Sequence, residues 1–294
     1  MKETLVKQLK NEPMRNHTTF KTGGPAKTLY LPSSTEEIRK AVEYAAENRI
    51  PWCVVGRGSN LLVSDKGYPG AVIKIADRFA RIEINGNKIY AEAGALLRDI
   101  TAKCIENALS GLEFAGGIPG ALGGGVSMNA GAYGGELKDY ITYVRVLTPE
   151  LEIKDIPCCD MQFGYRESAV QQTGYIVLGA EFCLPSGDRE ASRDLLQSLN
   201  NKRKSCQPLN YPSAGSTFKR PPGYFAGTMI EQCGLKGCKI GGAQVSEKHA
   251  GFIINIGDAT SEDIYKLICH VRDAVFQKTG VMLEPEVRMI GDFT

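Results

Sequence analysis

A glycine-rich stretch, residues 115–134, constrains the fold of this chain more than any other feature. Eight of its twenty residues are glycine and none is charged. Glycine loses more conformational freedom on folding than any other residue, so such a stretch needs a compensating gain. A series of surface turns is one interpretation. Because the stretch also carries apolar residues, we favour a flat backbone surface that lies against a large planar ligand.

A second, shorter glycine loop occupies residues 56–60, Gly-Arg-Gly-Ser-Asn. It directly follows an apolar run at 51–55, which predicts a buried strand. The loop lacks the third glycine and the opening helix of the dinucleotide-binding fingerprint, since residues 61–63 continue as an extended Leu-Leu-Val. Its backbone N–H groups can still converge on phosphate oxygens. Taken alone, the loop is equally consistent with a tight turn.

Length and composition indicate a folded chain of two or three domains. The 294 residues are 43% hydrophobic and 23% charged, with a formal net charge of +2. Nucleic-acid binding needs a concentrated basic face, which this balance argues against. The first residues, Met-Lys-Glu-Thr-Leu-Val-Lys, lack an apolar signal core, and no apolar run is long enough to span a bilayer. We therefore expect a cytoplasmic protein without membrane contact or an obligate protein partner.

The cysteines and histidines do not form a recognisable framework. Nine cysteines are an odd number in a large chain without an export signal, so we expect reduced thiols. The adjacent Cys158 and Cys159 have no second, properly spaced pair, and neither have Cys233 and Cys238. The three histidines also lack metal-ligand spacing. The sequence therefore predicts no metal site.

Hydrophobic periodicity predicts a mixed helix and strand content. A capping-box pattern at residues 34–37, Ser-Thr-Glu-Glu, opens the first helix. A final amphipathic helix begins at Ser261 and turns its aliphatic residues inward. Further helices are expected at about 96–108 and 188–204, and strands at about 51–55, 71–75, 81–93, 143–147 and 175–184. We place a domain boundary near residue 190.

Six motifs in order along the chain resemble the UDP-N-acetylenolpyruvoylglucosamine reductase family. That family belongs to the flavoproteins of the vanillyl-alcohol oxidase type. Together the six motifs are far more specific than any one of them. They lie at residues 56–62 (GRGSNLL), 117–134 (GIPG through NAGAYG), 165–168 (YRES), 214–221 (AGSTFKRP), 241–246 (GGAQVS, with Asn255) and 283–288 (LEPEVR).

The resemblance implies an α+β fold and a specific reaction. It implies a two-part FAD-binding domain at 1–190, with sub-domains at about 1–75 and 76–190, and a substrate-binding domain at 191–294. The short chain resembles the compact subtype, which lacks an inserted tyrosine-bearing loop. The family uses NADPH and enzyme-bound FAD to reduce the enolpyruvyl ether of UDP-N-acetylglucosamine to UDP-N-acetylmuramate, a peptidoglycan precursor.

The resemblance assigns catalytic roles to three residues. Arg166 suits the carboxylate and enolate of the substrate, because a guanidinium can meet a carboxylate with two parallel hydrogen bonds. Glu286 would assist the developing enol, and Ser216 would protonate the carbon. Read without the family, Arg166 forms an ordinary ion pair with an acid such as Glu167, Glu286 is a solvated carboxylate, and Ser216 is a turn residue.

The resemblance also assigns ligand contacts. Substrate would contact Tyr165, Lys219, Arg220 and Gln244, although some family members have Asn where this chain has Arg220. The basic residues Lys219, Arg220, Lys236 and Lys239 either face the substrate diphosphate or form a solvated face. The residues assigned to FAD are Gly56, Arg57, Gly58, Ser59, Asn60, Leu61, Gly117, Pro119, Gly120, Gly123, Asn129, Ala130, Gly131, Tyr133, Gly134 and Arg288.

Two other functions fit parts of the pattern. A flavin oxidase of the same type often tethers FAD through a histidine in the first glycine loop, but no histidine lies between His17 and His249. We therefore expect FAD to be bound non-covalently. A non-redox binder of sugar nucleotides would use the glycine loops only for phosphates, and its purified form would be colourless.

Overall fold

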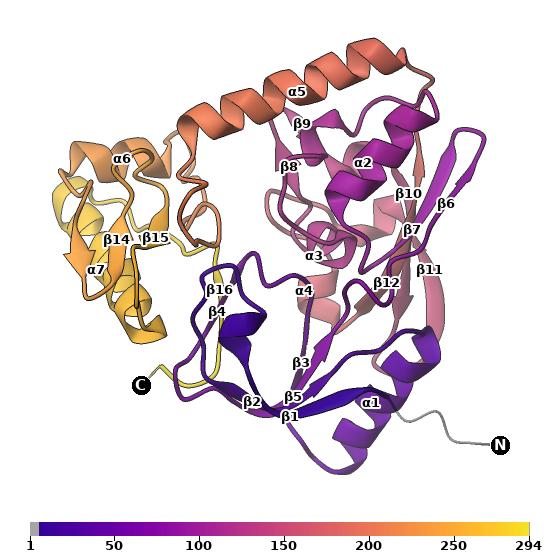
Figure 1. Cartoon of the computed structure of the whole chain (residues 1–294), viewed down its shortest axis with the longest axis horizontal. Coiled ribbons are helices and arrows are strands. Elements are labelled where there is room, and N and C mark those ends of the chain that lie inside the picture. The colour runs from indigo at the N-terminus through magenta and orange to yellow at the C-terminus, as the bar shows by residue number, and fades with distance from the viewer. Residues whose placement is uncertain (1–5, 294) are drawn as a thin grey trace. The chain divides into compact units, whose positions relative to one another are not determined.

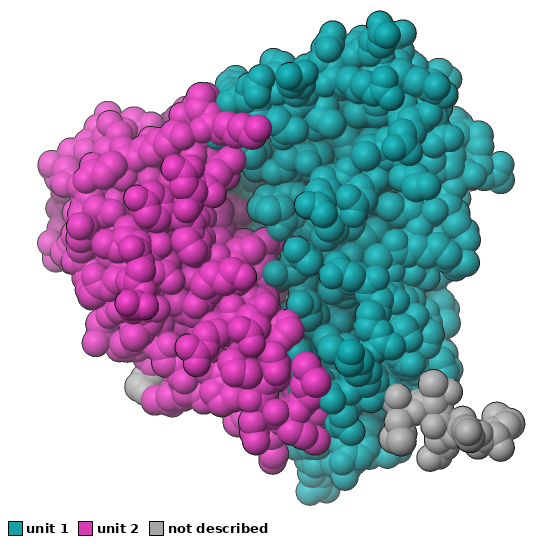
Figure 2. All heavy atoms as spheres, in the orientation of Figure 1, with its two compact units in different colours: residues 1–8, 29–57, 72–203 teal, residues 9–28, 58–71, 204–294 magenta. Residues whose placement is uncertain are grey.

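The computed structural model describes residues 6–293 of the chain, which divide into two compact units (Figure 2). Unit 1 comprises Met1–Gln8, Leu29–Arg57 and Val72–Arg203. Unit 2 comprises Leu9–Thr28, Gly58–Ala71 and Lys204–Thr294. Each unit therefore contains residues from both sides of position 190, so compactness divides the chain differently from the linear boundary expected there.

Unit 1 is built on a five-stranded antiparallel sheet with the strand order β11-β10-β12-β7-β6 (Figure 1). The central strand β12 (Ile176–Cys183) has five consecutive buried residues, because the helix α3 (Leu122–Ser127) packs against it. In the edge strand β11, four of the five residues are exposed. The remaining strands are β6 (Ile82–Asn85), β7 (Lys88–Glu92), β10 (Ile141–Leu147) and β11 (Ile153–Pro157).

The helices of unit 1 begin close to where the sequence predicts. In α1 (Thr35–Glu47) the Ser34 hydroxyl accepts the N–H of Glu37, as the capping box predicts. The Glu37 carboxylate, however, accepts from the N–H of Ser33 rather than from Ser34. Two further helices are α2 (Leu97–Glu106) and α4 (Val170–Thr173), and the long polar helix α5 (Arg189–Cys206) ends three residues inside unit 2.

A four-stranded sheet has the order β1-β2-β5-β3. Its strands are β1 (Gln8–Pro13), β2 (Pro25–Tyr30), β5 (Tyr68–Lys74) and β3 (Trp52–Val55). The chain passes from one unit to the other within β1, β2 and β5. Three strands of this sheet therefore have residues in both units.

Unit 2 has its own apolar core around helix α7 (Ser261–Thr279). A capping box of Thr260 and Asp263 starts this helix, and Gly280 ends it with a φ of +73°. The inward residues predicted from the sequence are confirmed as buried. Strands β13, β14 and β15 form a three-stranded sheet, and β16 pairs in parallel with β4. The bounds of these elements and of the remaining helix are β4 (Leu61–Val63), α6 (Ala226–Gln232), β13 (Lys239–Ile240), β14 (Ala243–Val245), β15 (Ile253–Asn255) and β16 (Arg288–Ile290).

The glycine-rich stretch does not form the flat surface expected from its composition. It folds into the short helix α3 followed by the hairpin β8 (Gly131–Ala132) and β9 (Gly135–Glu136). Several glycines serve close packing instead. A Cβ on Gly125 would lie 3.0 Å from the side chain of Leu137, and one on Gly123 would lie 3.1 Å from that of Ala93. The stretch thus forms a short helix and a hairpin, and glycines of the helix allow close packing against neighbouring side chains.

The structure bears on two expectations, that the chain does not span a membrane and that its cysteines are reduced. Over residues 6–293, no helix is both long enough and apolar enough to cross a membrane. Residues 1–5, which contributed to the expectation of a cytoplasmic protein, lie outside the described residues. All nine cysteines are free thiols in the structure.

Candidate active site

Thr217 anchors the segment that carries Ser216, the predicted acid. Thr217 is fully buried, its N–H donates to the carbonyl of Gly251 (2.8 Å), and its hydroxyl accepts the N–H of Ile253 (3.1 Å). Ser216 itself is exposed. The preceding Gly215 has a φ of +79°, a conformation that favours glycine, and a Cβ there would meet nothing within 4 Å. The anchored threonine therefore leaves the serine hydroxyl open to a ligand.

Glu286, the second predicted catalytic residue of unit 2, lies beside the Ser216 segment. The N–H of Glu286 donates to the carbonyl of Thr217 (2.8 Å). Its carbonyl accepts from the side-chain amide of Asn60 (3.0 Å), and the N–H of Arg288 donates to the carbonyl of Asn60 (3.1 Å). Three motifs that are far apart in the sequence are thus joined by main-chain hydrogen bonds within unit 2.

The first glycine loop has the geometry of an anion site. Among the described residues, no acceptor pairs with the main-chain N–H groups of residues 56–60. Consecutive free N–H groups in a turn favour a bound anion. Gly58 has a φ of +66°, and a Cβ there would collide with the carbonyl of His17. The loop is therefore able to bind an anion, and its second glycine is required by packing.

The remaining residues of this loop differ in exposure. Arg57 is exposed and its guanidinium lies 3.5 Å from Asp77. Ser59 and Asn60 are half-buried, whereas Leu61 is buried at the start of β4. A contact from Leu61 to a ligand would therefore come from its backbone.

Arg166 is held against the glycine-rich stretch in unit 1. Its guanidinium donates to the carbonyl of Gly131 (3.2 Å) and lies 5.1 Å from the centre of the Tyr165 ring. Arg166 adopts a φ of +60°, which is uncommon for a residue with a side chain. Its carbonyl accepts from the side chain of Gln171 (3.0 Å), which fixes this turn. The predicted catalytic residue Arg166 thus lies directly on backbone that was predicted to bind FAD.

Asn129 also links the glycine-rich stretch to the segment that carries Arg166. Its side chain is completely buried and donates to Glu136 (3.0 Å) and to the carbonyl of Gly164 (3.0 Å), while its oxygen accepts the N–H of Lys138 (3.2 Å). Burial works to raise the pKa of Glu136, but hydrogen bonds from Lys138 and Asn129 outweigh it and lower this pKa. The Asn129 side chain is therefore committed to the protein, and any contact with FAD would come from its backbone.

The other predicted FAD residues of the stretch include packed and open positions. Gly131 is packed, since a Cβ there would lie 2.8 Å from the carbonyl of Gly135. At Gly134, by contrast, φ is +93° and a Cβ would meet nothing within 4 Å, which leaves room for a ligand. Tyr133 and Pro119 are exposed. The carbonyl of Gly120 accepts the N–H of Leu97. The N–H of Ala130 donates to the carbonyl of Gly125, and the carbonyl of Ala130 accepts the N–H of Leu137. Gly117 packs against side chains of α5, and Gly123 packs against Ala93.

The predicted substrate contacts of unit 2 already have protein partners. The Lys219 ammonium lies 2.6 Å from the Glu284 carboxylate, and the side chain of Gln244 donates to the carbonyl of Gly237 (3.3 Å). The Arg220 guanidinium lies 4.5 Å from the centre of the Phe225 ring. Tyr165 of unit 1 is 44% exposed, so its ring is open to a ligand.

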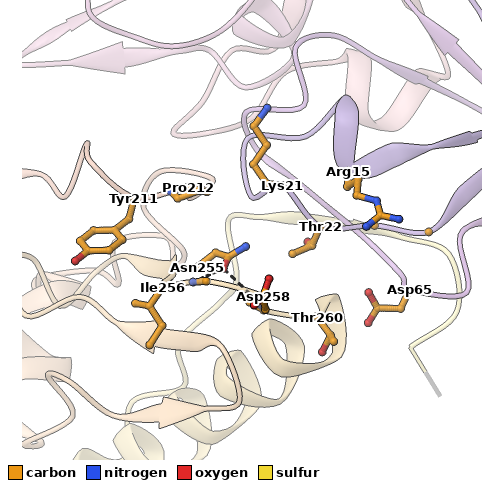
Figure 3. A pocket seen from close by; sticks show the side chains of 14 residues that line it. Arg15, Lys21, Thr22, Asp65, Tyr211, Pro212, Asn255, Ile256, Asp258 and Thr260 are labelled. Atoms are coloured by element: carbon orange, nitrogen blue, oxygen red, sulfur yellow. Dashed lines mark hydrogen bonds between the residues drawn. The ribbon is translucent and has the colours of Figure 1, made fainter.

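A hollow in unit 2 is lined by none of these residues (Figure 3). It has a volume of about 700 Å³ and is lined by the segments 21–24 and 255–260 together with Arg15, Asp65 and Tyr211. Asn255, at its floor, accepts the N–H groups of Gly257 and Ala259 and thereby shapes the loop before α7. No residue assigned to FAD, substrate or catalysis lines this hollow.

Sequence reasoning missed two residues of this region. Thr217 was treated only as part of the Ser216 motif, although its burial is what orients that motif. Arg203 was treated as part of a polar helix, yet it lies against Gly117. Alternation gave no signal for Thr217, because the neighbouring Phe218 is buried as well. No signal was available for Arg203 either.

Comparisons with known proteins identify two domains in this chain. Residues 26–156 match an FAD binding domain, and residues 207–290 match the UDP-N-acetylenolpyruvoylglucosamine reductase C-terminal domain. The chain is 46% identical to a UDP-N-acetylenolpyruvoylglucosamine reductase of Alkaliphilus oremlandii over 97% of this chain and 93% of that one. It is 50% identical to one of Clostridium beijerinckii over 95% of this chain and 91% of that one.

A solved structure shows the same fold. The structure of UDP-N-acetylenolpyruvylglucosamine reductase from Thermus caldophilus superimposes with a TM-score of 0.83 and 34% identity. The match covers 97% of this chain and 98% of that chain. The predicted α+β fold, an FAD-binding domain followed by a C-terminal domain of this reductase type, is thereby confirmed.

Proposed function

The chain belongs to the family of UDP-N-acetylenolpyruvoylglucosamine reductases, which are FAD-dependent oxidoreductases, and from this premise we propose that it uses NADPH to reduce UDP-N-acetylglucosamine enolpyruvate to UDP-N-acetylmuramate. The product is a precursor of peptidoglycan. We place the reaction in the cytoplasm, with small molecules as its only obligate partners. In this proposal residues 1–190 are the FAD-binding domain and residues 191–294 the substrate-binding domain, while Arg288 also contacts FAD and Tyr165 and Arg166 also contact the substrate.

The chemistry makes three demands on the protein. Bound FAD supplies a hydride that originates in NADPH. When the methylene carbon of the enolpyruvyl ether takes up the hydride, negative charge builds on the neighbouring carbon and its carboxylate. The protein must therefore hold the carboxylate, stabilise the charge and protonate that carbon.

Three side chains suit these demands. Arg166 offers a guanidinium for the carboxylate, and its hydrogen bond to Gly131 fixes its direction. Ser216 donates a proton to the carbon. A hydroxyl is a weak acid, but proton transfer to a carbanion-like enolate is strongly downhill, so position matters more than acidity. Glu286 assists the developing enol.

The observation that best supports the proposal is the hydrogen bond from Glu286 to Thr217 (2.8 Å). It joins the segments of the proposed acid and the proposed carboxylate, which are 70 positions apart in the sequence. Asn60, on the loop with unpaired N–H groups, is bonded to the same Glu286 backbone. Within unit 2, Asn60 and the segments that carry Ser216 and Glu286 are thus joined by hydrogen bonds.

The remaining contacts complete the proposal. Substrate contacts are assigned to Tyr165, Lys219, Arg220 and Gln244. Since Lys219 is paired with Glu284 in this structure, it would have to share its charge between that carboxylate and the substrate. FAD is bound without a covalent link, because no histidine lies in either glycine loop.

An anaerobic experiment with the purified protein tests the proposal. The yellow protein should lose its absorption near 450 nm when NADPH is added, and recover it when UDP-N-acetylglucosamine enolpyruvate follows. Mass spectrometry should then show UDP-N-acetylmuramate. Acid precipitation should release the colour into the supernatant. Flavin that is reduced by NADPH but not reoxidised by this substrate would contradict the proposed reaction.

A further inference from the structure

The side chain of Arg203 on helix α5 is a half-buried cation that the proposed chemistry does not use. Its Nε–H group is fully buried and has no acceptor among the described residues. Within residues 6–293, no ion pair joins it to a carboxylate. Burial lowers the pKa of Arg203, while the nearby phenol of Tyr133 acts to raise it. A buried charge without a counter-charge is unfavourable, so this position favours an anion.

Arg203 lies directly on the glycine-rich stretch. A Cβ on Gly117 would lie 3.0 Å from Arg203 Nε and 2.5 Å from Asn200 Oδ1. About two turns before Arg203 on α5, Leu196 packs in the same way on Gly116. The absence of side chains at these two glycines therefore lets α5 approach the backbone. Any ligand bound by this part of the stretch lies within reach of the guanidinium.

Tyr133 fixes the other side of this cation. Its ring centre lies 5.8 Å from the Arg203 guanidinium and 5.5 Å from the Lys202 ammonium. Aromatic rings attract cations, so the Tyr133 ring helps to hold the guanidinium in place. Tyr133 is 41% exposed and has a φ of +54°. Its strained backbone and open ring are typical of a ligand site.

We propose that Arg203, held between Gly117 and Tyr133, binds the diphosphate group of a nucleotide at the glycine-rich stretch, with Lys202 adding to the positive potential. This inference rests on the proposed function, because that reaction brings three diphosphate-bearing molecules to the protein: FAD, the UDP sugar and NADPH. All three present the same chemistry to a guanidinium, which forms paired hydrogen bonds with phosphate oxygens. Arg203 is a binding residue in this account and takes no part in proton transfer.

The test compares Arg203→Met with Arg193→Met, a matched control that removes an exposed arginine from the same helix. Three quantities are measured on the flavin-containing proteins. They are the FAD released on dilution, followed by flavin fluorescence, and the dissociation constants for UDP and for NADP⁺, followed by calorimetry. Loss of a hydrogen-bonded charge pair should weaken one of the three by on the order of 10-fold or more.

The ligand that is weakened identifies the source of the diphosphate. Arg203→Lys, which keeps the charge, should recover part of the lost affinity, and raising the salt concentration should weaken binding less in Arg203→Met than in the parent. If circular dichroism shows that Arg203→Met is unfolded, Arg203→Gln replaces it under the same criterion.

Two results separate this inference from the function on which it rests. If Arg203→Met is folded and holds all three ligands within about threefold of Arg193→Met, the inference is wrong while the proposed reaction stands. If the parent protein itself binds neither FAD, UDP nor NADP⁺, the proposed function fails, and this inference fails with it.

Discussion

The N–H of Glu286 donates a hydrogen bond of 2.8 Å to the carbonyl of Thr217. Since Ser216 directly precedes Thr217, this bond brings the two proposed catalytic residues of unit 2 onto adjoining backbone segments. The bridge between Phe218 and Pro285 and the bond from Lys219 to the carbonyl of Glu284 (2.8 Å) continue the pairing. The pairing of these two segments is therefore made by their main chain.

Thr217→Val should test this support. Valine keeps the shape but removes the oxygen that accepts the N–H of Ile253, which would leave a buried donor without a partner. Such a loss costs about 1–3 kcal/mol, and we expect the free energy of unfolding to fall by that amount in urea titrations. Thr217→Ser keeps the hydroxyl and is the control. Equal stability of the valine and serine variants would show that this hydrogen bond does not anchor the segment.

Local patterns were sufficient to predict much of the fold. The final helix was predicted from its inward aliphatic residues, and α7 buries Ile264, Leu267, Ile268, Val271 and Val275. The helix α1 and the strand before the first glycine loop were predicted in the same way, but the expectation that this strand is buried was wrong, because only Val55 of β3 is buried. These elements depend on periodicity and capping within one segment, which the sequence states directly.

Long-range packing decided what local patterns could not predict. Helix α3 contains three consecutive glycines, which disfavour a helix, yet contacts with Ala93, Leu97 and Leu137 stabilise it. Likewise the contact of Arg203 with Gly117 joins residues 86 positions apart. The motifs predicted Ser216 and Glu286 as site residues, but the hydrogen bond that joins their segments became visible only in the structure.

Arg166→Lys should separate the two halves of the reaction. Lysine keeps the charge but cannot keep both the bond to Gly131 and a paired contact with a carboxylate. Flavin reduction by NADPH should stay within about threefold of the parent, whereas substrate reduction should slow by ~10²–10³. Stopped-flow absorption measures both steps. Equal slowing of the two steps would instead assign Arg166 to the flavin or the fold.

His249 should make the stability of unit 2 depend on pH. Burial and the charge of Lys236 lower the pKa of His249, against a backbone hydrogen bond and Glu231, which raise it. Its Nδ1 accepts the N–H of Gly251 (3.1 Å), whose carbonyl in turn accepts from Thr217. The neutral ring is therefore the form that supports the fold.

The sign follows from linkage. Because the folded pKa lies below the unfolded value of 6.5, the contribution is complete above pH 6.5 and is lost as the pH falls through the folded pKa. His249→Asn keeps an acceptor near the position of Nδ1 but does not titrate. Between pH 7.5 and 5, the parent should lose more unfolding free energy than this variant. Parallel pH profiles would contradict this role.

The cysteines should be dispensable for turnover. Burial raises the pKa of the Cys104 thiol to about 12, so this residue should resist alkylation. Exposed thiols such as Cys159, Cys183 and Cys206 should react without loss of activity. After iodoacetamide treatment, mass spectrometry identifies the alkylated cysteines and an activity assay measures the remaining turnover. Rapid inactivation that bound substrate prevents would place a cysteine in the site.

The central claim is that Ser216 donates the proton, and Ser216→Ala tests it most directly. Stopped-flow absorption with NADPH and then with UDP-N-acetylglucosamine enolpyruvate should show normal flavin content, normal bleaching and a substrate-reduction rate lower by ~10²–10⁴. Ser216→Cys, which keeps a donor of similar size, should recover part of this loss, and the parent product formed in deuterated water should carry deuterium at the carbon that bears the carboxylate. A Ser216→Ala protein with an intact flavin that reduces the substrate at the parent rate would contradict the account.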